Sequence, residues 1–125
     1  MRIKTNIKLS IYDCDIIFII TDDLKSEVKT IYKKYEILTL EEDNNNEGES
    51  AGMLISPDID VYILLIDPHY LSHNTIAHEI YHAAVRITED RDISDEEAQA
   101  WLAGHITGVI YKFLDKKKIQ IKHDR

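Results

Sequence analysis

The chain has 125 residues, enough for one domain with a hydrophobic core and for little more. Its 15 Lys and Arg residues against 23 Asp and Glu residues give a formal net charge of −8, which argues against nucleic acid or an anionic membrane as its main partner. Cys14 is the only cysteine, so it excludes an intramolecular disulfide and a cysteine-based zinc site, and it fits a reducing cytoplasm. The N-terminus does not resemble a signal peptide, and the longest apolar runs, 16–20 and 61–66, have the length of strands.

The first part of the chain predicts a hairpin followed by a helix. Apolar and polar residues alternate over 7–12, and 16–20 is apolar on both faces, so we expect an outer strand paired with an inner one. Residues 21–23 can cap a helix in which Leu24, Val28 and Ile31 recur at helical spacing. This helix should cover one face of a sheet, and its tyrosines fit packing better than the wall of a substrate pocket.

The middle of the chain predicts more strands around an acidic loop. Residues 36–40 form a short strand candidate, and 41–50 read as a solvated loop or, alternatively, as a gate over an active site. A second hairpin is expected from 53–56 and 60–66 around a Pro57-Asp58 turn. The prediction is therefore an α+β domain with a small mixed or antiparallel sheet of about five strands, packed by three helices.

A His-Glu-x-x-His motif lies in the next helix, which Ser72 or Asn74 can cap. On a helix, His78 and His82 lie one turn apart on the same face, where both imidazoles can hold one Zn²⁺, and Glu79 can reach a water on that ion. The helix is apolar on most sides, so we expect it in the core, with metal coordination satisfying both imidazoles. The alternative is a pair of hydrogen-bonded histidines with no metal.

A catalytic zinc site needs a third protein ligand, and Glu97 in the following helix is our candidate. Glu97 shares a helical stripe with Gly104 and Gly108, which would let this helix pack closely against the metal helix. Glu96 is the rival ligand. The alternative role for Glu97 is a capping box with Ser94 as the N-cap residue.

Residues 75–83, followed by Asp95-Glu96-Glu97-Ala98-Gln99-Ala100-Trp101, resemble the small phage- and prophage-encoded zinc metallopeptidases and, more broadly, the gluzincins. The resemblance covers about residues 75–111. It implies a zincin-like fold over 1–125, a Zn²⁺ cofactor held by His78, His82 and Glu97, Glu79 as general base, a peptide or protein substrate, and a host cytoplasm as location.

Several functional alternatives stay open at this stage. The protein can be a zinc-dependent peptidase, a catalytically inactive zinc-binding protein that acts through a protein partner, or a hydrolase of another class such as a deformylase, which would normally need a cysteine ligand. No residue is assigned to stabilise the oxyanion. Three side chains just before the metal helix are the nearest candidates by sequence, namely His69, Tyr70 and His73.

Overall fold

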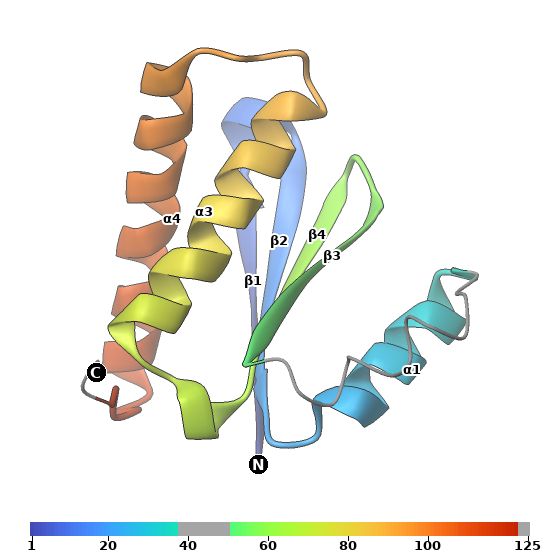
Figure 1. The fold of residues 1–125 in the computed structure, drawn as a ribbon, viewed down its shortest axis with the longest axis vertical. Helices are drawn as coiled ribbons and strands as arrows, with labels where there is room; N and C mark the ends of the chain where they lie inside the picture. Colours follow the sequence, from blue (N-terminus) through green and yellow to red (C-terminus); the bar gives the residue numbers. More distant parts are fainter. Residues whose placement is uncertain (38–50, 123–125) are drawn as a thin grey trace.

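Two β-hairpins lie side by side and form one mixed sheet (Figure 1). The computed structural model describes residues 1–37 and 51–122. Strand β1 (Arg2–Leu9) pairs antiparallel with β2 (Cys14–Thr21), and β3 (Gly52–Asp58) pairs antiparallel with β4 (Val61–Ile66). The inner strands β2 and β4 are parallel, which gives the order β1-β2-β4-β3. Both predicted hairpins are confirmed.

The described residues contain four strands in this sheet, whereas about five were expected. Most of the strand predicted over 36–40 lies outside the described residues. The turn of the second hairpin is at Ile59-Asp60 and not at Pro57-Asp58, because β3 continues through Pro57. Proline is tolerated in an edge strand, and the register of β3 shifts between Ile55 and Asp58.

One face of the sheet is covered by α1 (Leu24–Lys34), as predicted. Its N-cap is Asp23, whose carboxylate accepts a hydrogen bond from the backbone N–H of Ser26 at 3.2 Å. The buried side chains of α1 pack against alternate residues of the inner strands, such as Ile19 and Ile63. This small core closes the sheet on the side away from the helix that carries the His-Glu-x-x-His motif.

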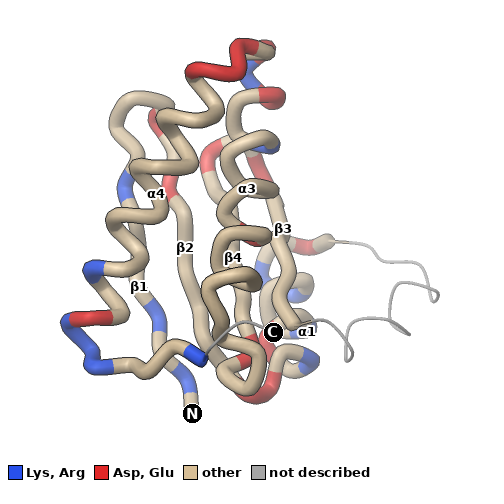
Figure 2. Tube along the Cα trace, turned by 60° about the vertical axis from the view of Figure 1, so that its left-hand side comes forward, with Lys and Arg blue, Asp and Glu red and all other residues tan. Residues whose placement is uncertain are grey.

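The opposite face is covered by two helices, α3 (His73–Glu89) and α4 (Glu96–Lys116). A short 3₁₀ turn, η3 (Pro68–Tyr70), leads from β4 into α3, and Ser72 caps α3 by accepting from the N–H of Thr75 at 3.1 Å. Helix α4 lies beside α3 and runs back along it (Figures 1 and 2). Among the described helices, none combines the length and the apolar character needed to cross a bilayer.

The face that α4 turns toward the core differs from the prediction. The buried residues are Leu102, Ile106, Ile110 and Leu114. Around the ideal Cβ positions of Gly104 and Gly108 there is no atom within 4 Å, so the expected close packing of these glycines on α3 is wrong. The larger aliphatic side chains bury more apolar surface than glycine and alanine can, and they therefore determine the orientation of the helix.

Candidate metal centre

The two histidines of the motif lie together on the solvent side of α3. The Nε2 atoms of His78 and His82 are 3.1 Å apart, and the ring centroids are 4.6 Å apart. Both residues are exposed, and the side chain of His78 retains 62% of its accessible surface. The expectation that both imidazoles lie in the core is therefore wrong, because the apolar side of α3 that faces the sheet carries Ile76, Ile80 and Ala83 instead.

The histidine pair fits one half of a zinc site. Two nitrogen ligands at about 2.0–2.1 Å from a tetrahedral zinc ion lie about 3.3 Å apart, close to the separation of the two Nε2 atoms here. A spacing of 3.1 Å also allows one imidazole to donate a hydrogen bond to the other. The pair can therefore exist without metal and is arranged so that a single divalent ion can replace the shared proton.

Glu79 lies beneath the histidine pair and is buried, with 8% of its side-chain surface accessible. Its Oε2 atom is 4.0 Å from Nε2 of His78. Burial raises the pKa of the Glu79 carboxyl above its usual value, and the neighbouring His78 and His82 oppose this shift. A carboxylate that is removed from water next to two metal-ligand candidates has the position and the basicity of a general base.

Gly52 of β3 lies against Glu79. A Cβ atom at this residue would be 2.9 Å from the carbonyl oxygen of Leu65 and 3.0 Å from Cγ of Glu79. A glycine inside a strand indicates such a close approach, but the residue that approaches it depends on the tertiary fold. The sequence analysis therefore missed Gly52 as part of the site.

Strand β3 also presents backbone groups next to the site. The N–H of Asp67 donates to the carbonyl of Ala51 at 2.9 Å, and Gly52 is paired with Ile66. Facing residues of an antiparallel pair are alternately hydrogen-bonded and not, so the N–H and C=O groups of Gly52 and Leu54 point away from β4. Within the described part of the chain, β3 is an edge strand of the sheet.

A pocket of about 470 Å³ joins the motif to this edge strand. An adjoining hollow of about 290 Å³ shares Gly52, His78 and Glu79, and it adds Asn74 and Thr75 from the start of α3. The side of the larger pocket beyond His82 is formed by Arg86 and Glu89. The larger pocket is lined by Gly52, Met53, Leu54, His78, Glu79, His82, Val85, Arg86 and Glu89.

Glu97 is not brought into this pocket. It is exposed in the first turn of α4, where its backbone N–H donates to the carboxylate of Asp95 at 3.1 Å. Asp95 is thus the N-cap residue, and the capping box with Ser94 does not form. Over residues 1–37 and 51–122, the structure contains no group of three or more His, Cys, Asp or Glu side chains arranged to hold a metal ion.

The position of α4 explains why Glu97 is remote. Gln99 donates to the hydroxyl of Thr88 at 3.3 Å, so the start of α4 lies beside the last turns of α3. Thr88 is six residues beyond His82, or about 9 Å along the helix axis. Glu96 begins the same exposed turn and does not replace Glu97 at the pocket.

The three side chains considered for the oxyanion also lie elsewhere. His69 pairs with Asp67 at 2.8 Å, and Tyr70 is exposed. His73 stacks on Tyr111, with 2.7 Å between its Nδ1 atom and the Tyr111 hydroxyl. None of the three lines the larger pocket as the described residues form it.

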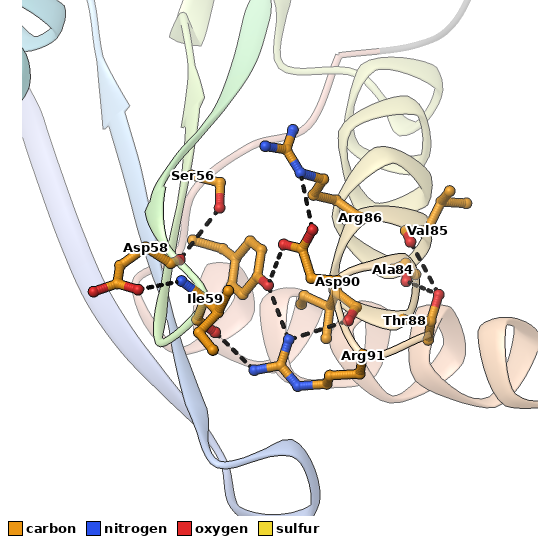
Figure 3. Close-up of polar contacts among 11 residues, drawn as sticks. Ser56, Asp58, Ile59, Ala84, Val85, Arg86, Thr88, Asp90 and Arg91 are labelled. Carbon is orange, nitrogen blue, oxygen red and sulfur yellow. Dashed lines mark hydrogen bonds and ion pairs between the residues drawn. The ribbon is translucent and has the colours of Figure 1, made fainter. Parts of the chain in front are cut away.

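A partly buried cluster of hydrogen bonds joins the end of α3 to the sheet (Figure 3). The hydroxyl of Tyr62 donates to Asp90 at 2.7 Å and accepts from Nη1 of Arg91 at 2.9 Å. Arg91 also donates to the carbonyl groups of Ile59 at 2.7 Å and Tyr12 at 3.1 Å. Burial, reinforced by the hydrogen bond to Asp90, raises the pKa of Tyr62 to about 12. These bonds fix the direction of α3 relative to both hairpins.

Comparison of the chain with protein-family models, with curated proteins and with solved structures found no match.

Proposed function

We propose that this protein is a zinc-dependent metallopeptidase in which His78 and His82 bind the metal and Glu79 is the general base. The observation that carries the proposal is the meeting of three groups at one pocket. Two imidazole nitrogens lie 3.1 Å apart, and a buried carboxylate lies 4.0 Å from one of them. The resemblance of the motif to gluzincins and the packing of α3 beside an edge strand support a zincin-like fold.

Zinc held by the two histidines would supply Lewis-acid chemistry, polarising a carbonyl oxygen and making water acidic near neutral pH. Glu79 would take the proton from the attacking water and pass it to the leaving amine. The raised pKa of its carboxyl suits both steps, because the group is a stronger base than an exposed glutamate and a usable acid once protonated.

The outward backbone groups of Gly52 and Leu54 support an extended peptide as the substrate. A peptide that adds to the edge of β3 would gain main-chain hydrogen bonds. Because Gly52 contacts Glu79, such a peptide would pass directly beside the general base and the histidine pair. This geometry favours a peptide or amide over a small soluble substrate.

Glu97 is not a ligand in the exposed position that the structure gives it, and it becomes the third ligand only if the first turn of α4 moves toward His82. The alternative is a zinc-binding protein that does not catalyse and acts through a protein partner. Two features favour that alternative, namely the exposure of the histidines and the lack of a third ligand among the described residues. The two functions differ in whether bound zinc is accompanied by hydrolysis.

The deciding experiment compares the wild-type protein with Glu79→Gln at equal zinc loading on a peptide library. We expect cleavage by the wild-type protein and a loss of at least 100-fold in Glu79→Gln, with zinc content unchanged. His105→Ala, at an exposed position on α4, is the control and should retain cleavage. Equal cleavage by wild type and Glu79→Gln would exclude the proposed mechanism, and zinc binding without any cleavage would favour the non-catalytic alternative.

A further inference from the structure

The outer face of α4 has a composition that the monomer does not explain. We define this face by five exposed residues, Ala100, Trp101, Gly104, His105 and Gly108. Glycine is less favourable in a helix interior than any residue other than proline. Nothing lies within 4 Å of the ideal Cβ position of either glycine, so the fold of one chain leaves room for a larger residue at both.

The surface around these residues is also free of formal charge. Residues 98–111 contain no Asp, Glu, Lys or Arg, although 30% of the whole chain is charged. Beside them, α3 has only one such residue between His73 and Arg86, the buried Glu79. Figure 2 shows the middle of α4 as a tan, uncharged stretch, with charged residues toward both ends of the helix. Trp101 lies within it, 52% exposed.

The two ends of α4 carry opposite charges. Asp95, Glu96 and Glu97 are exposed at the start. Near the end there is one acidic residue, Asp115, among four exposed lysines: Lys112, Lys116, Lys117 and Lys118. This polarity is favourable for the dipole of the helix itself. It also makes α4 complementary to a second α4 that runs antiparallel, since the acidic end of each copy then meets the basic end of the other.

We infer that the outer face of α4 is the interface of a homodimer in which two α4 helices pack antiparallel about a two-fold axis near Gly104 and Gly108. The glycines let the helix backbones approach closely, and Trp101 supplies the large aromatic contact typical of an interface centre. A second copy fits better than an unrelated partner because one two-fold axis satisfies both charged ends at once. Each chain carries a net charge of −8, so two copies repel overall, and pairing of opposite charges at the interface has to offset this repulsion.

This inference does not rest on the proposed zinc chemistry, and its test is sedimentation velocity of the full chain in a metal-free buffer with chelator. We expect a species of twice the 14.5 kDa chain mass over a range of about 10–500 µM. Gly104→Ala combined with Gly108→Ala should weaken dimerisation at least tenfold. The same variant should raise the melting temperature of the dilute monomer by several degrees, because alanine favours the helix.

Charge reversal tests the antiparallel arrangement. Glu96→Lys with Glu97→Lys should weaken the dimer, and so should Lys116→Glu with Lys117→Glu. All four changes in one chain should restore the dimer although they oppose the dipole of each helix. Lys33→Glu with Lys34→Glu on α1, at exposed positions on the other side of the sheet, is the matched control and should leave dimerisation unchanged.

Three outcomes would overturn the inference. The first is a single-chain mass up to 500 µM. The second is a dimer whose affinity does not respond to the alanine replacements of Gly104 and Gly108. The third is a fourfold charge variant that is no more dimeric than either pair of reversals alone.

Discussion

A Cβ atom on Gly52 would lie 3.0 Å from Cγ of Glu79, so the edge strand and the proposed general base are in direct contact. The same Cβ atom would lie 2.9 Å from the carbonyl oxygen of Leu65. One neighbour is backbone of the adjacent strand and cannot give way easily. The other is the side chain of Glu79, the proposed general base. Gly52 therefore sets both the spacing of β3 and the position of Glu79.

Gly52→Ala should destabilise the protein and impair the site together. We expect a loss of about 1–3 kcal/mol in the free energy of unfolding, the usual cost of forcing an extra carbon into a packed region. Any peptidase activity should fall further than stability alone explains, because Glu79 must shift. Urea denaturation and activity at saturating zinc provide the two measurements.

Gly104→Ala is the matched control for this change, because no atom occupies the space of its added methyl group. In dilute solution, where the chain is monomeric, it should stabilise the protein by about 1 kcal/mol, the helix preference of alanine over glycine. If Gly52→Ala raised the free energy of unfolding as Gly104→Ala does, the close contact between residue 52 and Glu79 would not constrain the packing of this region.

His78→Ala and His82→Ala should each abolish stable zinc binding, because either change leaves only one imidazole. Calorimetric titration with zinc and metal analysis of the purified protein measure this effect. His105→Ala, whose ring stacks on Trp101, removes an exposed histidine away from the pocket and should bind zinc like the wild type. Because both motif histidines are exposed, their replacement should change stability by less than about 0.5 kcal/mol in the absence of metal.

Glu97→Ala tests whether the first turn of α4 closes over the metal. With Glu97 held in the exposed position that the structure gives it, zinc affinity should change less than twofold. Glu96→Ala is the paired control, since Glu96 starts the same turn. A loss of tenfold or more in Glu97→Ala alone would establish Glu97 as the third ligand and would require α4 to move.

Tyr62 should make stability sensitive to alkaline pH. Its pKa is raised from 10.0 to about 12 in the folded protein, so the unfolded chain loses the proton first. Tyr62 therefore contributes about 3 kcal/mol to the free energy of unfolding below pH 10. This contribution is lost as the pH rises through 12. Melting temperatures between pH 8 and pH 12 should therefore fall more steeply for the wild type than for Tyr62→Phe.

At pH 7, the same replacement removes hydrogen bonds to Asp90 and Arg91, and it should cost about 1.5–3 kcal/mol. Tyr70→Phe is the control because Tyr70 is exposed. If the melting temperatures of wild type and Tyr62→Phe fell equally between pH 8 and pH 12, groups other than Tyr62 would account for the loss of stability at alkaline pH.

The sequence predicted the elements that depend on local patterns. Alternation of apolar and polar residues predicted the outer strand of the first hairpin, and apolar runs predicted the other strands. Hydroxyl or carboxylate groups at Ser72 and Asp23 marked where helices begin. The position of the His-Glu-x-x-His motif on one helix likewise follows from spacing alone. These features need only neighbouring residues to be specified.

Local sequence patterns could not predict which face of α4 is buried. Its helical wheel offers two uncharged sides, one with Leu102 and Ile106 and one with Gly104 and Gly108. The small residues predicted close helix packing, but burial of the large aliphatic side chains releases more free energy and turns that side to the core. Glu97 lies on the side with the glycines and therefore faces solvent with them. The sequence also could not predict the contact of Gly52 with Glu79, because this contact depends on how α3 packs against the sheet.

The two edges of the sheet that the described strands form differ in their protection against association. Strand β1 carries the exposed cations Arg2, Lys4 and Lys8 along its length, and a charged edge resists pairing with strands of other molecules. Between Gly52 and Ser56, strand β3 carries no charge at all. Aggregation by addition of a strand from another, partially unfolded chain should therefore begin at β3. A lysine introduced at an outward position there would improve solubility and weaken the proposed peptide site.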